Sequence, residues 1–300
     1  MLSWITDYRG EIAALSAAFC WTLSSVIYGR IGPQMPPLQL NFIKGVISIS
    51  GIVITFWLQG TWIPEIPARS LFLLSMSGII GIGLGDTAFF NTLNRLGPRR
   101  TLLVQTLAPP LAAVLAVAFL SESLAGRAWI GIALILLGVA WVISDRVSEI
   151  PTERQQIGEG LLWGFVSAFC QAGGAVLSRA ALADTVASPL SAAFVRLVSG
   201  LVVILLWMWI LPAARQTPWK PVPSARLWGA LGLAAFVGTY LAIWLQQTSL
   251  KFAPAGISQT LSATSPLFVL PIAARAGEKI GIRAVLGALA AVVGVALLFN

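Results

Sequence analysis

Apolar residues are grouped along the chain in about ten stretches of 18 to 25 residues, separated by short polar connections. Each stretch is long enough to cross a hydrocarbon layer of roughly 30 Å at about 1.5 Å per residue. This pattern predicts an all-α membrane protein with ten transmembrane helices and no soluble domain. The predicted spans are 10–30, 36–58, 70–94, 98–120, 125–145, 158–181, 188–212, 225–249, 253–275 and 280–299.

The stretch from Arg95 to Ala140 recurs 156 residues later, from Lys251 to Ala296, without a gap. The alternative, that two apolar helices merely look alike, does not explain why rarer residue types match at one constant offset. We therefore predict two copies of one unit, at residues 1–147 and 158–300, with 148–157 as the connecting loop. The matched residues include Pro98 and Pro254, Pro110 and Pro266, Glu122 and Glu278, Arg127 and Arg283, Gly131 and Gly287, and Gly138 and Gly294.

Each copy holds five spans, an odd number, so the second copy enters the membrane from the side opposite to the first. The predicted architecture is therefore two inverted five-helix repeats. Inverted repeats that bind a substrate near the middle of the bilayer are a recurrent design of secondary transporters, because exchanging the conformations of the two halves changes which side is open.

Composition narrows the class further. The chain is 57% hydrophobic and 10% charged and contains no His, which does not describe a water-soluble surface. The net charge of +8 comes from Lys and Arg scattered singly over the connections, so they are interpreted as anchors at the membrane flanks and no nucleic acid is expected. Cys20 and Cys170 lie at equivalent places in spans 1 and 6 and are predicted to be packing residues, so no metal site and no cofactor are expected.

Two cations stand at matching places in spans 2 and 7. Lys44 and Arg196 each lie about seven residues, roughly 10 Å, inside their own end of the span. A long cationic side chain can extend from such a depth to the nearest interface, or it can face a cavity inside the bundle. Because the repeats are inverted, the two cations are expected at similar depths from opposite faces.

Asp86 is the only carboxylate well inside a predicted span, and Asn91 follows it on the same helix. A lone charge near the bilayer centre costs about 2.5 to 3.5 kcal/mol, so Asp86 is expected to pair with Lys44 or to be protonated. The second copy has no acid at this place, only the region around Tyr240, so Arg196 is expected to lack a partner and either to receive an anionic substrate group or to bind backbone carbonyls. Without any His, Asp86 is the natural carrier if protons are the coupling ion.

Prolines near the middle of spans 4 and 9 predict broken or kinked helices at matching places, which are pointers to a transporter's binding site. These are Pro109, Pro110 and Pro266, and simple kinking without ligand contact is the alternative. Other polar or aromatic residues inside the spans are candidates for the cavity lining. They are Trp21, which alternatively serves helix packing, Gln171 at the matching place in span 6, Gln105 and Gln259.

The remaining landmarks are glycines and acids near the ends of the repeats. Gly131 and Gly138, and their matches Gly287 and Gly294, lie seven residues apart on one face of spans 5 and 10, which predicts packing or homodimer-forming helices. Glu122 and Glu278 lie at the ends of spans 4 and 9, where an electrostatic or capping role is expected rather than catalysis.

Taken together, these residues resemble the EamA-type branch of the drug/metabolite transporter superfamily over nearly the whole chain. The resemblance implies a central cavity between spans 1–4 and 6–9 and the export or exchange of small metabolites such as amino acids. The basic residue that the family carries in spans 2 and 7 falls on Lys44 and Arg196, but the Trp-Gly pair common in its first span is Trp21-Thr22 here. The resemblance is carried by Gly85-Asp86-Thr87, Phe89-Phe90-Asn91, Pro110-Leu111, Pro266-Leu267, Glu122 and Glu278.

The expected function is therefore a secondary transporter in the cell (inner) membrane, with the lipid bilayer and a small amino-acid-like or organic-anion substrate as partners. An intramembrane enzyme is not expected, because the chain has no His, no G-x-S-x-G motif and a single buried carboxylate. A structural or assembly protein is the alternative. Orientation stays open: five Lys and Arg flank the spans on the side of the termini and twelve on the other, which favours external termini, whereas the resemblance implies cytoplasmic ones.

Overall fold

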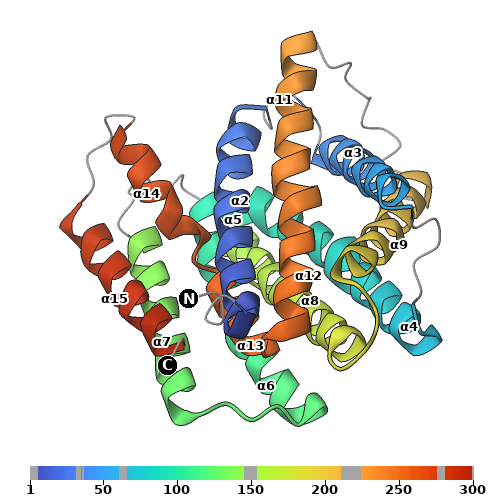
Figure 1. Ribbon diagram of the computed structural model, residues 1–300. Helices are drawn as coiled ribbons and strands as arrows, with labels where there is room; N and C mark the ends of the chain where they lie inside the picture. The colour runs from blue at the N-terminus through green and yellow to red at the C-terminus, as the bar shows by residue number, and fades with distance from the viewer. Residues whose placement is uncertain are drawn as a thin grey trace.

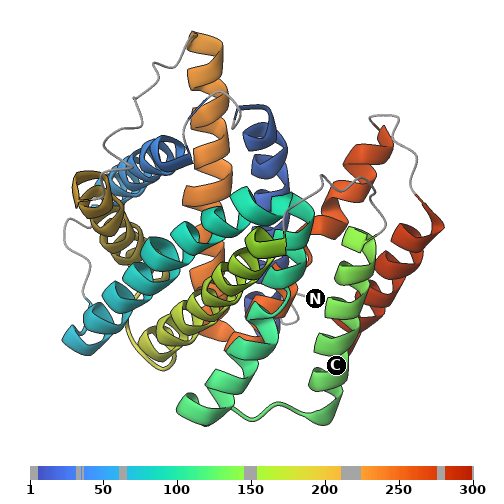
Figure 2. The same cartoon turned by 180° about the vertical axis from the view of Figure 1, so that it is seen from behind.

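The structure is a computed structural model that describes residues 6–31, 35, 37–60, 66–144, 154–210, 224–275 and 281–298, and all regular secondary structure within these residues is helical (Figures 1 and 2). In chain order the elements are α2 (Arg9–Ile31), α3 (Pro37–Leu58), α4 (Ala68–Ser77), the π-helical η2 (Gly78–Gly85), α5 (Asp86–Gln105), α6 (Ala108–Leu120), α7 (Gly126–Ser144), α8 (Arg154–Leu182), α9 (Pro189–Ile210), α11 (Ala225–Ala235), the π-helical η3 (Phe236–Leu241), α12 (Ala242–Phe252), α13 (Ala255–Ser262), α14 (Ser265–Arg275) and α15 (Ile282–Leu298).

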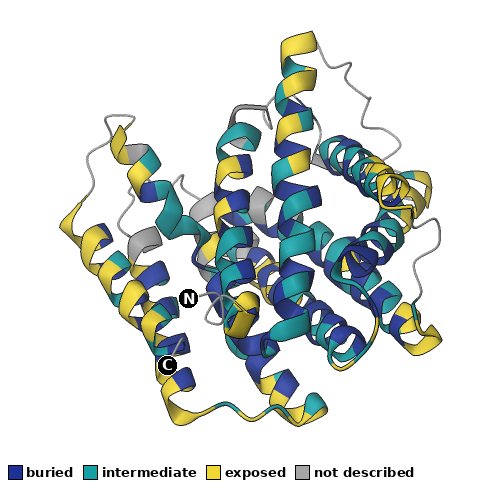
Figure 3. Ribbon diagram, in the orientation of Figure 1, coloured by how far each residue is buried: buried dark blue, intermediate teal, exposed yellow. Residues whose placement is uncertain are grey.

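Six helical runs among the described residues are long and apolar enough to cross a membrane, and three shorter helices are apolar as well. Exposed residues follow the outer faces of the helices (Figure 3). They include large apolar side chains such as Trp57, Phe72 and Phe119, which suit a surrounding of lipid rather than water. The prediction of an all-α membrane protein is confirmed, and the count of ten spans stays a prediction. The six runs are Arg9–Tyr28, Gln39–Leu58, Ala68–Phe89, Ile157–Leu182, Pro189–Ile210 and Ala225–Phe252, and the shorter helices are Ala108–Leu120, Gly126–Trp141 and Ile282–Leu298.

One predicted boundary is wrong. The sequence placed a connection between spans 3 and 4 just before Pro98, but α5 continues as a helix from Asp86 through that proline to Gln105. A proline removes one backbone hydrogen bond and can kink a helix without ending it. In the second half the helix does end at the matching place, because Ala253 is extended and Pro254 caps the start of α13.

Helices α7 and α15 lie side by side, and glycines at matching places of the repeat form their contact (Figure 1). A methyl group added to Gly131 would lie 2.9 Å from the carbonyl oxygen of Gly294, and one added to Gly138 would overlap the carbonyl oxygen of Gly287. Gly131 matches Gly287 in the repeat, and Gly138 matches Gly294. The contact of Gly131 with Gly294 is therefore equivalent to the contact of Gly287 with Gly138, as in an isologous interface. This crossed pattern is the signature of inverted repeats. It also occupies the glycine faces within one chain, so the predicted homodimer requires another surface.

We expect Gly138→Ala to destabilise the protein by about 1 to 3 kcal/mol, because the added methyl group must push α15 away from α7. Gly229→Ala in α11 is the matched control, since a methyl group there meets no atom within 4 Å and alanine favours a helix by about 1 kcal/mol over glycine. Thermal unfolding of the two purified variants in detergent measures the difference. Equal unfolding temperatures would show that the α7–α15 contact contributes little to stability.

The two ends of the bundle can be told apart by which helices meet there. At the end where α2 begins, called the near end, the guanidinium of Arg9 lies 3.4 Å from the centre of the Phe252 ring in the last turn of α12. At the opposite end, called the far end, Arg95 of α5 forms an ion pair of 3.3 Å with Glu159 near the start of α8. Helix α8 thus begins at the far end and helix α12 ends at the near end, as the predicted inverted topology requires.

Candidate substrate cavity

A cavity of about 40 Å³ lies between the two halves, where α3 and η2–α5 of the first half meet α9 and η3–α12 of the second. Two charged side chains, two other polar side chains and a set of apolar ones line it. Its volume has room for about three water molecules and is far smaller than the binding sites of metabolites. The lining residues are Asn41, Lys44, Gly45, Ile82, Asp86, Leu197, Leu201, Ile204, Thr239 and Ile243.

Asp86 reaches the cavity because it begins α5 directly after the π-helical segment η2. A π-helix leaves backbone carbonyls displaced from their usual helical partners, and here side chains of α8 bind them. Gln171 Nε2 donates to the carbonyl of Gly81 at 3.2 Å, and the hydroxyl of Ser167 donates to that of Gly85 at 2.9 Å. The second half therefore holds the backbone that positions Asp86.

The Asp86 carboxylate is held by one amide and two cations. Gln171 Nε2 donates to its Oδ1 at 3.3 Å, and both Lys44 and Arg196 interact with it electrostatically. Among the described residues, however, no ion pair within 4 Å joins Asp86 to Lys44 or to Arg196. Lys44 and Asp86 both belong to the lining of the cavity.

Arg196 does not line the cavity, although the sequence predicted it as a candidate anion receptor without a partner. Its side chain is buried at 4% exposure, its Nη1 donates to Gln246 Oε1 at 3.3 Å, and its charge interacts with Asp86. Its backbone lies against Gly78 of η2, and a methyl group at Gly81 would meet its Nη2 at 3.2 Å. Among the described residues no ion pair within 4 Å joins Arg196 to an acid, so the expectation that it lacks an acidic partner stays a prediction, and only the longer-range interaction with Asp86 reaches across the halves.

The π-helical segments themselves were not predicted. They occur at matching places, η2 in the third helix of one half and η3 in the third helix of the other, and each packs on the opposite half. Ser48 of α3 donates to the carbonyl of Ala235 beside η3, while Gly200 at the matching place in α9 lies against Gly78 of η2. The density of glycines from Gly78 to Gly85 is the one local signal in the sequence for η2.

The predicted proline sites coincide with breaks in two helices. In the first half α5 ends at Gln105 and α6 begins at Ala108, with Pro109 and Pro110 in its first turn. In the second half α13 ends at Ser262 and α14 begins at Ser265, directly before Pro266. Helix α2 holds the second break, because Thr22 Oγ1 donates to the carbonyl of Ser265 at 2.8 Å and Ser265 Oγ donates to that of Ala18 at 3.0 Å.

The other candidate residues lie away from the cavity lining. Asn91 accepts a hydrogen bond from Arg95 Nη1 at 3.0 Å and donates to the carbonyl of Thr87, so it serves its own helix. The hydroxyl of Tyr240 lies 2.9 Å from that of Thr55 and joins η3 to α3. Trp21, Gln105 and Gln259 are half-buried, and the amide nitrogen of Gln105 is enclosed without a hydrogen-bond partner.

The two halves share helix breaks at matching places and enclose a cavity between them, an arrangement that occurs in membrane transporters. The model of the EamA-like transporter family matches residues 8–144 and, a second time, residues 158–300. The chain belongs to the EamA-like transporter family, a family of membrane transporters, and is an integral multi-pass membrane protein.

The fold is also found among solved structures. One of them, described as "Crystal structure of protein", superposes with a TM-score of 0.81 at 17% sequence identity and covers 97% of this chain and 96% of its own. At that identity the likeness shows the fold alone. No curated protein matches the chain at a significant level.

Proposed function

We propose that this protein is a secondary transporter that exports or exchanges a small amino-acid-like or organic-anion metabolite by alternating access. The observation that carries the proposal is the cavity between the halves, whose lining includes Lys44 of α3 and Asp86 of α5. A structural membrane protein has no need for two charged side chains that face a space inside the bilayer, because each such charge is costly there.

The lining favours an amphipathic substrate. The ammonium of Lys44 can bind a carboxylate through a charge-assisted hydrogen bond, and Asp86 can accept a hydrogen bond from an amino or hydroxyl group of the same molecule. Apolar side chains such as Leu201, Ile204 and Ile243 surround these two charges and suit an apolar body. A cavity of about 40 Å³ does not hold such a molecule, so this conformation precedes an opening of the halves.

The coupling ion is proposed to be the proton, with Asp86 as the group that carries it, and the membrane is proposed to be the cell (inner) membrane. A carboxylate between two cations and a substrate site is a natural place for such coupling, since substrate and proton then interact with the same charge.

Substrate binding and counterflow test the proposal together. Thermal unfolding of the purified protein with a panel of amino acids, nucleosides and organic anions is expected to show stabilisation by carboxylate-bearing compounds, because a ligand that binds the native state raises its apparent stability. Proteoliposomes preloaded with the stabilising compound are then expected to take up its labelled form faster than empty ones, and an imposed pH gradient is expected to change that rate. Binding of neutral compounds only would overturn the substrate class, and uptake without counterflow would indicate a pore.

A further inference from the structure

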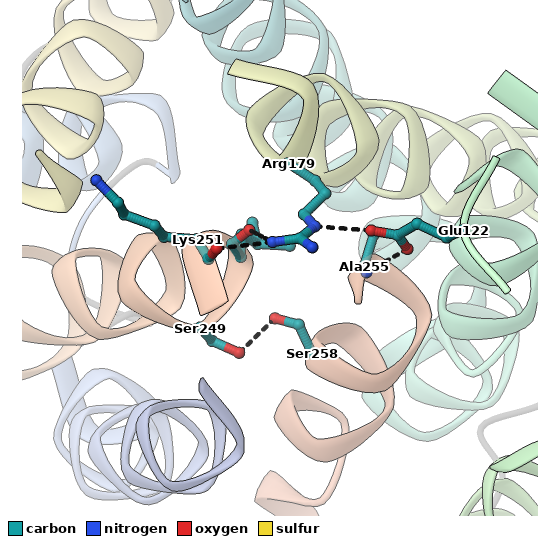
Figure 4. A network of polar contacts seen from close by, with 7 residues as sticks. Glu122, Arg179, Ser249, Lys251, Ala255 and Ser258 are labelled. Atoms are coloured by element: carbon teal, nitrogen blue, oxygen red, sulfur yellow. Dashed lines mark hydrogen bonds and ion pairs between the residues drawn. The ribbon is translucent and has the colours of Figure 1, made fainter. Parts of the chain in front are cut away.

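A group of polar contacts at the near end joins the two halves of the chain (Figure 4). Glu122, just beyond α6 in the first half, accepts a hydrogen bond of 2.7 Å from Arg179 Nε and another of 3.0 Å from the backbone amide of Ala255. Arg179 Nη1 in turn donates to the carbonyls of Leu250 at 3.1 Å and Lys251 at 2.7 Å. These five residues are named the near-end clamp.

Each charge of the near-end clamp lies at a helix end of opposite polarity. The carboxylate of Glu122 binds the first amide of α13, where unpaired N–H groups make a helix terminus positive. The guanidinium of Arg179 binds carbonyls in the last turn of α12, where a helix terminus is negative. Arg179 is one of the cations predicted to be membrane-flank anchors, but in the structure it is the centre of an interaction among α6, α8, α12 and α13.

The backbone fixes the position of Glu122. Ser121 ends α6 with a left-handed φ of 55°, and the amide of Glu122 donates to the carbonyl of Ala116 at 3.3 Å, which closes the last turn of that helix. Arg179 projects from the last turn of α8, which ends at Leu182. Glu122 follows α6 closely and Arg179 lies in the last turn of α8, so a movement of either helix displaces a charged residue of the near-end clamp.

The near end is closed around this group. Ser249 and Ser258, joined by a hydrogen bond of 2.7 Å, are fully buried beside the clamp (Figure 4), and the side chains of Glu122 and Arg179 are 12% and 18% exposed. The far-end pair of Arg95 and Glu159 is 31% and 51% exposed and also links the first half to α8. An exposed single pair holds helices weakly, whereas a network at paired helix ends holds them firmly.

We propose that the near-end clamp is the closure that shuts the substrate cavity off from the near end of the bundle, and that it breaks each time the transporter opens in that direction. This proposal rests on the alternating-access function proposed above. The clamp suits repeated opening because its charges lie at the edge of the bundle, where water can solvate them once the helices separate. Arg196, buried in the middle, has no such alternative.

Cysteine labelling of the full chain, reconstituted and without substrate, tests the clamp. In a background of Cys20→Ala and Cys170→Ala, one chain carries Ser258→Cys beside the clamp and another carries Asn41→Cys in the cavity lining. Glu122→Gln keeps the shape of the side chain and removes its charge. It is expected to raise the labelling rate by a polar thiol reagent about tenfold at position 258 and also to raise it at position 41, because the population shifts toward the state in which the cavity is open at the near end.

Matched variants separate a closure from a merely structural contact. Glu159→Gln removes the far-end ion pair and is expected to leave position 258 protected, while Glu122→Asp, which keeps the charge, is expected to restore slow labelling there. Unchanged rates in Glu122→Gln, or equally fast labelling at position 258 in Glu159→Gln, would overturn the proposal, since the second outcome means a generally loosened fold. Arg179→Gln gives the same test from α8 if Glu122→Gln does not fold. No transport is measured, so the outcome is independent of whether the substrate panel yields a ligand.

Discussion

Replacing Lys44 by Met is expected to weaken binding of a carboxylate substrate about 10- to 100-fold while leaving the folded protein intact. The ammonium lines the cavity and makes no ion pair within 4 Å to Asp86, so its free hydrogen-bonding capacity is available to a substrate. Removing it costs the complex a charge-assisted hydrogen bond. Asp86 loses the stronger of its two interactions with cations but keeps Arg196 and the hydrogen bond from Gln171, so the empty protein is expected to remain folded. The substrate concentration at half-maximal counterflow and the ligand-induced shift in unfolding temperature measure the change.

The control for this prediction is Arg226→Met, which removes an exposed cation at the start of α11 and alters the net charge by the same amount. Affinity is expected to stay unchanged in that variant and to return in part with Lys44→Arg, whose charge remains but whose geometry differs. If Lys44→Met bound substrate as well as the native protein, Lys44 would only neutralise Asp86. A large drop in unfolding temperature in the absence of substrate would lead to the same conclusion.

The helices and their breaks were predictable because each depends on residues that are close together in the sequence. Apolar length fixes a span, and a proline inside one, such as Pro266, marks where its backbone hydrogen bonds cannot continue. The repeat added information that no single helix carries, since matching prolines and glycines implied matching structure in both halves. Pro98 shows the limit of this reasoning, because a proline can be accommodated within a helix and only the surrounding contacts decide whether the helix ends.

The site was less predictable because it is made of contacts between halves. The sequence placed Lys44, Asp86 and Arg196 at their depths, but depth along a helix does not give the direction of a side chain around it. Arg196 was therefore assigned to the cavity, whereas its side chain packs against Gly81 and is absent from the cavity lining. The partners of Arg179 were hidden for a related reason, since two of them are backbone carbonyls, which every sequence position possesses.

The role assigned to Arg196 leads to the second large effect. Arg196→Met is expected to destabilise the protein by about 3 to 5 kcal/mol, because it removes a buried charge that interacts with Asp86 and a donor to Gln246. The cost is expected to exceed that of Lys44→Met several-fold, since Lys44 is only half-buried. Unfolding in mixed micelles with increasing denaturing detergent measures both. A stable Arg196→Met that fails to bind substrate would instead return Arg196 to the substrate site.

A double variant decides whether Asp86 is the reason for this cost. Truncating one member of a buried charge pair leaves the other uncompensated, so the loss contains a penalty that disappears when both charges are removed. Asp86→Asn added to Arg196→Met is therefore expected to recover a large part of the stability, with an interaction energy well above the roughly 0.5 kcal/mol within which independent sites add. Additive losses would mean that Arg196 stabilises the fold through Gln246 and η2 alone, and that Lys44 is the cation that compensates Asp86. Recovery of stability would instead assign different roles to the two cations. Arg196 would be the internal counter-charge of Asp86, and Lys44 would be the cation available to the substrate.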